Sequence, residues 1–239
     1  MIKDHRPFAV KRAIQKFEQF YVRHFLVPQL AALGHGFAIL RPWYVEIFGG
    51  PVTIGKNVTL IANSDQKIRF VVWPGKLAGG RIVIGDNVII SPGARISAAT
   101  EIIIGNNSMI ANGAYITDSD WHGIYDRVST GNSKPIHLEQ NVWIGDSAII
   151  CKGTTIGENS IIGAGAVVVG NIPANCMAAG NPAKVLKRLN SDKKIVTRSQ
   201  FFNDPQHSTE HTLKLERYLL AENTFLKWLR VLFFPRRGD

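Results

Sequence analysis

Several features that mark other protein classes are scarce or missing in this sequence of 239 residues. It contains no run of eighteen apolar residues, so we expect no membrane-spanning helix. Residues 1–12 mix charged and apolar side chains without a long apolar stretch, which argues against a secretory signal. The two cysteines, Cys151 and Cys176, are too few for a disulfide framework or a metal motif. These absences favour a protein of the reduced cytoplasm.

Acidic residues are also in short supply. The 18 Asp and Glu residues face 28 Lys and Arg residues, which gives a net charge of +10. This excess suggests an anionic partner, and a nucleotide-bearing cofactor, an acidic glycan and a membrane surface all fit. We expect no nucleic-acid partner. The composition, 45% hydrophobic and 19% charged, is ordinary for a globular chain of one long domain or two short ones.

What the sequence does contain is a repeat with a period of six residues. A β-branched or otherwise aliphatic residue recurs at this spacing, at Ile54 and Leu60; at Ile84, Ile90 and Ile96; at Ile104, Ile110 and Ile116; at Leu138, Ile144 and Ile150; and at Ile156, Ile162 and Val168. Four residues after nearly every one comes a small or β-branched residue: Val58, Ser64, Val88, Ala94, Thr100, Ser108, Ala114, Val142, Ala148, Thr154, Ser160 and Ala166.

This period fits neither a helix nor a simple alternating strand. It fits a short strand followed by a corner, with both recurring positions pointing inward and Gly, Asn or Asp residues forming the turns. Three such units make one triangular coil, and stacked coils bury continuous aliphatic ladders. A β-sandwich with regular hairpins is the alternative, but so many repeats in one phase argue against it.

The phase is interrupted at two long insertions, near residues 65–80 and 117–135, and loops of this kind often carry function. We therefore expect a β-helix domain over residues 37–189. Residues 1–36 have apolar positions at helical spacing and predict a helical extension. Residues 190–239 predict a polar linker and an amphipathic helix. Both extensions either pack on the prism or on neighbouring subunits, or contact a membrane surface.

The pattern resembles the hexapeptide-repeat acyltransferases, whose fold is a left-handed parallel β-helix, and most closely their sugar O-acetyltransferase branch, which includes galactoside and maltose acetyltransferases. The resemblance covers about residues 52–189 and is strongest from Asn141-Val-Trp-Ile-Gly through Ile162-Gly-Ala-Gly-Ala to Ala179-Gly-Asn-Pro-Ala-Lys. It implies a homotrimer with each site in a cleft between two prisms, acetyl-CoA as the donor, and a role such as polysaccharide biosynthesis. The sequence shows no cluster of metal ligands, so we expect that no metal is required.

His122 is the candidate catalytic base. It lies in the longer insertion among acids and an arginine, and transfer to a hydroxyl needs a group that accepts a proton near neutral pH. The resemblance gives this role to a loop histidine here, although His122 lies one residue further from Ile116 than is common. His137 is the rival, but it precedes Leu138 within a predicted strand and should point outward. Cys151 has no base near it in sequence.

Three residues are candidates for the acceptor side of the site. Asp118 and Asp120 lie near His122, where a carboxylate would orient the imidazole, bind acceptor hydroxyls, or simply be solvated. Asn63 follows Ala62 at a place where the resembled family carries an Ala-Asn pair that contacts the acceptor.

Five residues are candidates for the donor side. The Gly- and Ala-rich stretch around Ala164 allows a ligand to approach the backbone closely, and the resemblance places a donor contact there. Lys184 and Lys187 follow the Gly-Asn-Pro turn, where the family has basic residues on the nucleotide phosphates. Asp146 occupies a place near the donor where relatives often have a small polar residue. Trp143 either lines the cleft or packs at a subunit contact.

These observations predict an acetyl-CoA-dependent O-acetyltransferase acting on a sugar or glycan hydroxyl by direct transfer. Three alternatives remain open: N-acetylation of an amino sugar, transfer of a longer acyl chain to a lipid-linked acceptor, and a non-catalytic β-helix binding module. The basic, apolar C-terminal end, residues 224–237, also suggests peripheral contact with the inner face of the cytoplasmic membrane.

Overall fold

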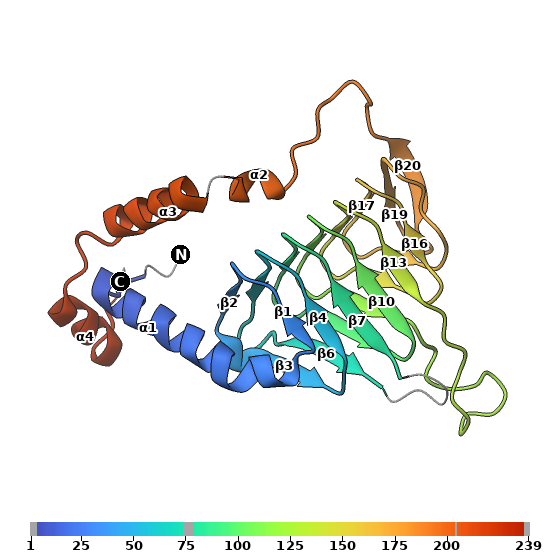
Figure 1. Cartoon of the computed structure of the whole chain (residues 1–239), viewed down its shortest axis with the longest axis horizontal. Coiled ribbons are helices and arrows are strands. Elements are labelled where there is room, and N and C mark those ends of the chain that lie inside the picture. The colour runs from blue at the N-terminus through green and yellow to red at the C-terminus, as the bar shows by residue number, and fades with distance from the viewer. Residues whose placement is uncertain (1–3, 74–78, 204, 237–239) are drawn as a thin grey trace. The chain divides into compact units, whose positions relative to one another are not determined.

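A computed structural model describes residues 4–73, 79–203 and 205–236 of the chain. The chain divides into two compact units, Tyr21–Ser199 and the combination of Met1–Phe20 with Gln200–Asp239. The first unit is built from short strands that wind around a common axis, and the second is helical (Figure 1).

The strands of the larger unit form three sheets, which we name A, B and C. Sheet A contains β1 (Ala32–Leu33), β4 (Val52–Ile54), β7 (Arg81–Ile84), β10 (Glu101–Ile104), β13 (Ile136–Leu138) and β16 (Thr155–Ile156). Sheet B contains β2 (Ala38–Leu40), β5 (Thr59–Ile61), β8 (Ile89–Ile90), β11 (Met109–Ile110), β14 (Trp143–Ile144), β17 (Ile161–Ile162), β19 (Cys176–Ala179) and β20 (Lys184–Arg188). Sheet C contains β3 (Val45–Phe48), β6 (Ile68–Val72), β9 (Arg95–Ala98), β12 (Tyr115–Thr117), β15 (Ile149–Ile150) and β18 (Val167–Val168).

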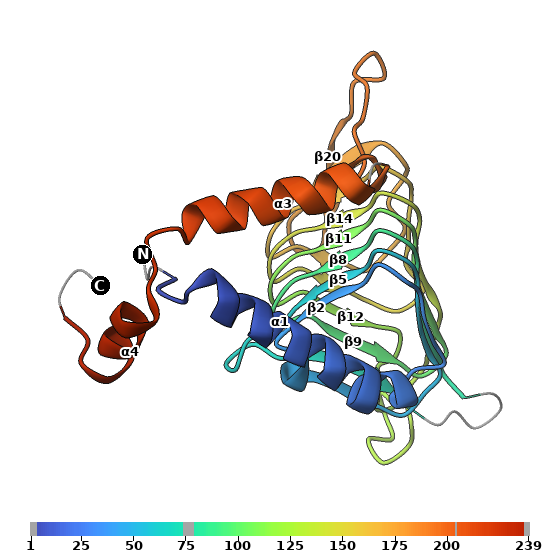
Figure 2. The ribbon, with the colours of Figure 1, turned by 60° about the vertical axis from the view of Figure 1, so that its left-hand side comes forward.

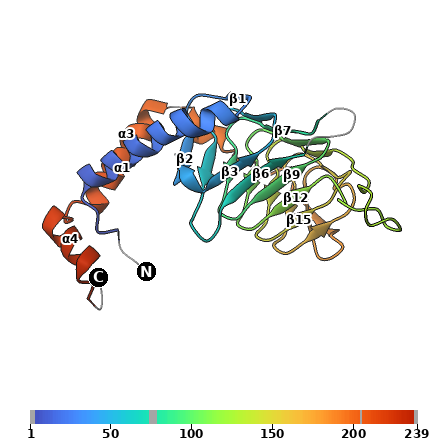
Figure 3. The ribbon, with the colours of Figure 1, turned by 90° about the horizontal axis from the view of Figure 1, so that it is seen from below.

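From β1 to β18, successive strands visit the sheets in the order A, B, C and then return to A one coil further along, whereas β19 and β20 both lie in sheet B. Strands of sheet B stack in order in Figure 2, and those of sheet C lie side by side in Figure 3. Among the described strands, neighbours pair in parallel, except that β19 and β20 are antiparallel. This architecture is a triangular parallel β-helix.

The six-residue repeat forms the core of this prism. Each of the fourteen recurring aliphatic residues, from Ile54 to Val168, is at most 2% exposed. Of the twelve small residues four positions later, ten are buried, Thr100 is half-buried and Ser64 is exposed. The expectation for Ser64 is wrong because Asn63 and Gln66 exchange backbone hydrogen bonds of 3.2 and 3.3 Å, which makes a tight turn that leaves Ser64 outside the coil.

The three corners of the prism differ in how the chain turns. At the corner between sheets A and B, asparagines adopt positive φ, and their side chains bond along the axis, as from Asn141 to Asn159 (2.9 Å) and from Asn159 to Asn175 (2.8 Å). At the corner between sheets B and C, Gly93, Gly113 and Gly165 take the positive φ that a tight turn requires. The corner between sheets C and A carries the long insertion, so this corner has room for a site.

The predicted insertion near residues 65–80 contains a strand, because residues 68–72 form β6 of sheet C. Residues 74–78 of this insertion lie outside the described residues. The register of β6 with β3 and β9 makes it an ordinary strand of the prism. The strands also begin at Ala32, before the expected domain start at residue 37. Residues 117–135, by contrast, contain no strand beyond the last residue of β12, and the chain leaves the corner as a projecting loop (Figure 1).

The first end of the core is covered by a short helical segment. The π-helix Val22–Leu26 and the 3₁₀ helix Val27–Gln29 continue from α1 (Phe8–Tyr21), and Val22 and Leu26 are buried in the core of the prism. A further 3₁₀ helix, Pro42–Tyr44, lies between β2 and β3, where the Trp43 ring meets the Tyr21 ring edge-on at 5.9 Å. This segment caps the aliphatic ladders, as an open solenoid end requires.

The second unit contains α1, α2 (Ser199–Phe202), α3 (Pro205–Leu219) and α4 (Phe225–Phe233). The single amphipathic helix expected within residues 190–239 is divided in two, because the chain turns between Leu219 and Phe225. The Lys11 Nζ atom lies 3.0 Å from a carboxylate oxygen of Glu216, and the amide of Asn223 donates to the Asp4 carbonyl oxygen at 2.6 Å. These contacts hold the N-terminal helix against the C-terminal ones. Among the described residues, no helix is long and apolar enough to cross a membrane.

Candidate functional site

His122 lies in the projecting loop between β12 and β13. Its backbone N–H donates to the Asp120 carbonyl oxygen at 2.8 Å, and its Nδ1 atom lies 2.9 Å from the Arg127 carbonyl oxygen. A carbonyl oxygen can only accept, so the neutral imidazole carries its hydrogen on Nδ1. The Nε2 atom then holds the lone pair, and the side chain is exposed. This is the tautomer that a general base needs.

Asp118 has a position that the sequence did not predict. It is fully buried, and its carboxylate accepts hydrogen bonds from the backbone N–H groups of Ala99 (2.6 Å), Thr100 (2.7 Å) and Glu101 (2.9 Å) and from the Thr100 hydroxyl (2.8 Å). A carboxylate occupied in this way is placed neither to orient His122 nor to meet an acceptor. Asp118 instead anchors the base of the loop to the preceding coil.

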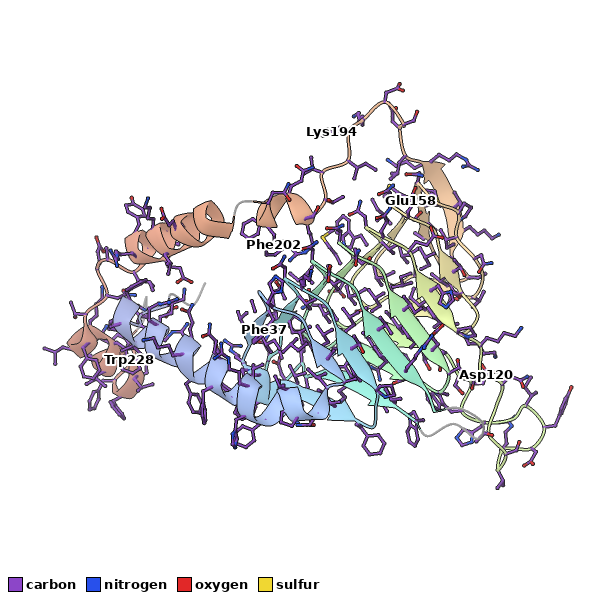
Figure 4. The ribbon with its side chains drawn as sticks, viewed as in Figure 1. Phe37, Asp120, Glu158, Lys194, Phe202 and Trp228 are labelled. Atoms are coloured by element: carbon purple, nitrogen blue, oxygen red, sulfur yellow. The ribbon has the colours of Figure 1, made fainter. Side chains whose placement is uncertain are left out.

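Asp120 lies at the root of the loop (Figure 4), where its carboxylate forms an ion pair with Lys152 of the next coil. The two side chains are 40% and 25% exposed, so solvent reaches both. The backbone of Asp120 also accepts from His122, so this residue positions the base through its main chain. Asp120 and His122 are therefore neighbours, as expected, while the Asp120 carboxylate faces a lysine.

The loop returns through a glycine that a larger residue could not replace. A Cβ atom at Gly131 would lie 2.4 Å from the His122 carbonyl oxygen. On the same return path, the Asp120 N–H donates to the Asn132 carbonyl oxygen at 3.1 Å, and the hydroxyls of Ser119 and Ser133 lie 3.0 Å apart. These contacts give the loop a defined shape around His122.

Cys151 lies beside Lys152 at the same corner of the prism. Burial raises the pKa of the Cys151 thiol, and the negative charge of Asp120 raises it further. The sulfur is therefore protonated at neutral pH and is a poor nucleophile.

His137 is part of a different site on the outer face of sheet A. Its Nε2 atom lies 3.1 Å from Oε1 of Glu101, which also pairs with Arg81. Partial burial raises the pKa of Glu101, but the hydrogen bonds from His137 and Arg81 lower it by more, so the carboxylate stays ionised. The pocket around His137, about 540 Å³ in volume, is lined by Glu139 and Glu158 but not by His122.

Most of the predicted donor-side residues gather on sheet B and its corner with sheet C. Trp143 is 45% exposed on the outer face of β14, in register with Met109 and Ile161. Asp146 and Ala164 occupy the same place in successive coils, where the Gly165 N–H donates to the Asp146 carbonyl oxygen at 2.7 Å. Both side chains are exposed.

Lys184 and Lys187 lie on β20, the antiparallel last strand of sheet B. All five residues of β20 are exposed, so both ammonium groups are free to meet an anion from solvent. Asn63 lies at the corner between sheets B and C, where its side-chain oxygen accepts from Arg41. Within one chain, the structure therefore does not bring Asn63 or the donor-side residues to the corner that holds His122.

Two features escaped the sequence reasoning. At the corner between sheets B and C, a groove of about 390 Å³ is lined by Lys67, Arg69 and Arg95. At the corner that carries His122, the aromatic rings of Trp73 and Trp121 contact each other. The only sequence signal for Trp73 and Trp121 is that each follows a strand of sheet C.

Among the described residues, no group of three or more His, Cys, Asp or Glu side chains is arranged to hold a metal ion.

Comparison with protein families finds two matches within the prism. The family described as bacterial transferase hexapeptide (six repeats) matches residues 135–170, and the hexapeptide repeat of succinyl-transferase matches residues 81–118. Both matches fall on the coils that the six-residue spacing predicted.

Curated relatives are acetyltransferases. Galactoside O-acetyltransferase of Escherichia coli is 35% identical over 164 residues, which cover 69% of this chain and 66% of the relative. A second Escherichia coli protein, "Putative lipopolysaccharide biosynthesis O-acetyl transferase WbbJ", is 34% identical over 158 residues, which cover 61% of this chain and 76% of the relative. The chain thus spans about two thirds to three quarters of the length of these two relatives.

A solved structure shares the fold. An N-acyltransferase from Bacillus cereus, in complex with dTDP-4-amino-4,6-dideoxyglucose and coenzyme A, superposes with a TM-score of 0.58 at 17% identity, over 80% of this chain and 96% of that one. Together with the family matches, it confirms the expected fold class, a left-handed parallel β-helix with helical extensions at both ends.

Proposed function

Because this chain belongs to the hexapeptide-repeat acetyltransferases, we propose that it transfers an acetyl group from acetyl-CoA to a hydroxyl of a sugar or glycan. The observation that supports it most directly is the contact between His122 Nδ1 and the Arg127 carbonyl oxygen, which leaves Nε2 able to accept a proton. Two relatives are named as O-acetyltransferases, which favours oxygen as the acceptor atom.

The proposed reaction is a direct transfer. His122 Nε2 removes the proton from the acceptor hydroxyl while the oxygen of that hydroxyl attacks the thioester carbonyl carbon. The tetrahedral intermediate carries a negative oxygen that backbone N–H groups stabilise. When it collapses, the C–S bond breaks, and the imidazolium returns its proton to the departing thiolate. The products are the acetyl ester and coenzyme A, and His122 is neutral again.

The site that we propose forms between two chains of a homotrimer. His122 projects from the corner between sheets C and A, whereas Trp143, Asp146 and Ala164 lie on sheet B and its corner with sheet C. Residues at different corners of one prism face different directions. A cleft between two prisms would bring the base of one chain to the donor contacts of the next.

On the donor side, the exposed backbone around Ala164 would bind the pantetheine arm, with Trp143 and Asp146 beside it. Lys184 and Lys187 on β20 would meet the nucleotide phosphates. Asn63 would contact the acceptor from its own corner of the prism. On the acceptor side, the Asp120 carboxylate would bind a hydroxyl only through the lone pairs that its ion pair with Lys152 does not use.

We also propose that the helical unit associates peripherally with an anionic membrane. On α4 and just after it, Leu226, Leu232, Phe233 and Phe234 are between 57% and 79% exposed, next to Lys227 and Arg236. Exposed apolar side chains mixed with cations suit the interface of an anionic bilayer. Such contact would hold the enzyme near an acceptor on a lipid carrier.

The deciding experiment is a thiol-release assay with acetyl-CoA and a panel of sugars, nucleotide sugars and glycolipids. Release that depends on a hydroxyl acceptor and on His122 supports the proposal. Release only with amino sugars would favour N-acetylation. A preference for longer acyl donors would favour a lipid-linked acceptor, and no release with any acceptor would favour a binding module.

A further inference from the structure

Three aromatic side chains form a row at the corner that carries His122. The Phe48 and Trp73 ring centroids are 5.8 Å apart, and those of Trp73 and Trp121 are 5.4 Å apart. We call these three residues the aromatic row. Phe48 is 58% exposed and Trp73 is 45% exposed, so the row offers ring surface to solvent although each ring packs on its neighbour.

The row runs along the axis of the prism and ends at Trp121, the residue that precedes the proposed base His122. Phe48 ends β3, and Trp73 follows β6, the next strand of sheet C. The coil after that has only the small residues Ala98 and Ala99 at this corner. The loop after β12 therefore reaches back over this coil, and Trp121 meets Trp73. Because His122 directly follows Trp121, the row leads away from the base toward the first coils.

The backbone at Trp121 is held in an unfavourable conformation. Its φ of +63° lies in the left-handed region, which bulky side chains rarely adopt. Elsewhere in the described chain, non-glycine residues with positive φ are six asparagines, Ser147 and Arg41. The Trp121 N–H donates to the Ser119 hydroxyl at 3.1 Å, which helps to fix the turn. Strain of this kind tends to accompany functional sites, and here it occurs at the residue that precedes the proposed base.

We propose that the aromatic row is an acceptor subsite that binds consecutive sugar rings of an oligosaccharide by stacking, a step that rests on the proposed acetyl transfer. The C–H face of a pyranose is apolar and packs on indole and phenyl faces, while its hydroxyls need polar partners. The partly exposed ion pair of Asp120 and Lys152 supplies such partners, and Asp120 directly precedes Trp121 in the loop. The row extends one way from His122, so the acetylated sugar lies at the base and its neighbours lie over Trp73 and Phe48.

The test compares acceptors of increasing length. Initial rates and direct binding by calorimetry are measured with one-, two- and four-unit gluco-, galacto-, manno- and N-acetylglucosamine oligosaccharides, with acetyl-CoA present in the rate assays. We expect the best four-unit acceptor to bind better than its monosaccharide. Trp73→Ala should weaken that binding and raise the acceptor KM roughly tenfold, the effect of losing one stacked ring, without changing the KM for acetyl-CoA.

Two variants separate stacking from folding. Trp73→Phe keeps a ring and should retain most of the affinity. Tyr125→Ala removes an aromatic that is 99% exposed in the same loop but outside the row, and it should change neither KM. Thermal unfolding of each variant shows whether the fold is kept.

The outcomes distinguish this proposal from the acetyl transfer on which it rests. If the enzyme turns over but longer acceptors have no advantage, or the acceptor KM is unchanged in Trp73→Ala, the proposed subsite is wrong and the proposed acetyl transfer stands. If oligosaccharides bind in a way that depends on Trp73 but no thiol is released, the proposed acetyl transfer is wrong and the proposed subsite stands. If no oligosaccharide binds better than its monosaccharide and none is acetylated, both are wrong.

Discussion

His122 can act as a base because the Arg127 carbonyl oxygen holds its Nδ1 atom, which leaves the lone pair on Nε2. His122→Ala should therefore reduce turnover by roughly 10²–10⁴, the usual contribution of general acid–base catalysis. The residue is exposed on a loop outside the core, so thermal unfolding should be unchanged. His137→Ala is the matched comparison, since the His137 imidazole also has a defined polar partner, the carboxylate of Glu101. Full activity in His122→Ala with a loss in His137→Ala would assign the base to sheet A.

Asp118 should contribute to stability rather than to proton transfer. Asp118→Ala removes the acceptor of three backbone N–H groups and one hydroxyl, and we expect the free energy of unfolding to fall by about 3 kcal/mol. Asp126→Ala is the control, because Asp126 accepts at 3.0 and 3.3 Å from Val128 and Ser129 in the exposed part of the same loop. Denaturant unfolding should show a much smaller change there. Equal effects would mean that Asp118 is not the anchor.

The limits of sequence reasoning are visible at single residues. The place of His122 in an insertion was enough to mark it as a candidate, since insertions leave a regular solenoid. The burial of Asp118 could not be predicted, because its partners, residues 99–101, lie in the preceding coil. The contact of Trp121 with Trp73 depends in the same way on how far the loop folds back. These contacts are set by loop conformation, which a six-residue period does not encode.

At the scale of elements, the period predicted every strand from β4 to β18 except β6, because each inward position had to be aliphatic or small. It did not extend to β1, β2 and β3 or to β19 and β20. It missed β6, since the turn at residues 63–66 shifts the phase and only the alternation of Ile68, Phe70 and Val72 remains as a signal. The division of the C-terminal helix at residues 220–224 was missed as well, because apolar residues continue on both sides of the turn.

The strand β20 carries a prediction about the donor. The double variant Lys184→Ala, Lys187→Ala should raise the KM for acetyl-CoA about three- to tenfold, with little effect on the acceptor KM, since exposed charges interact weakly. A donor that lacks the 3′-phosphate should lose less if either lysine meets that phosphate. Lys193→Ala removes another exposed charge, from the loop that follows β20, and should change neither the KM for acetyl-CoA nor that for the acceptor. An unchanged KM in the double variant would place the nucleotide elsewhere.

At the scale of the whole molecule, a site shared between chains makes a prediction that a site within one chain does not. We expect His122→Ala and Ala164→Trp each to be nearly inactive alone, the second because its indole would block the donor groove. Co-expressed in equal amounts, they should recover about a quarter of wild-type activity, because one interface in four pairs an intact base with an intact donor groove. Size-exclusion chromatography with light scattering checks that the mixed species is a trimer. Activity that stays at the level of the single variants would place base and donor within one chain.

The helical unit carries the prediction about membranes. Phe233 and Phe234 are 67% and 72% exposed at the end of α4, and such apolar surface is unfavourable in water unless something covers it. Each basic residue near an anionic surface adds about 1 kcal/mol of attraction, so binding should be weak and sensitive to salt. The full chain should therefore sediment with anionic vesicles at low salt and not with neutral ones.

Two changes separate apolar from electrostatic contributions to that binding. The double variant Phe233→Ser, Phe234→Ser removes apolar surface and keeps every charge, whereas Lys227→Glu reverses one charge and keeps the apolar surface. Because both changes lie in the helical unit, the prism and its acetyl-transfer activity in solution should be unaffected. We expect the serine variant to lose binding at all salt concentrations, and the charge variant to lose it mainly at low salt, where attraction is least screened. If the full chain and both variants bind anionic and neutral vesicles equally poorly, the exposed phenylalanines are covered by protein, and the helical unit serves packing or assembly instead.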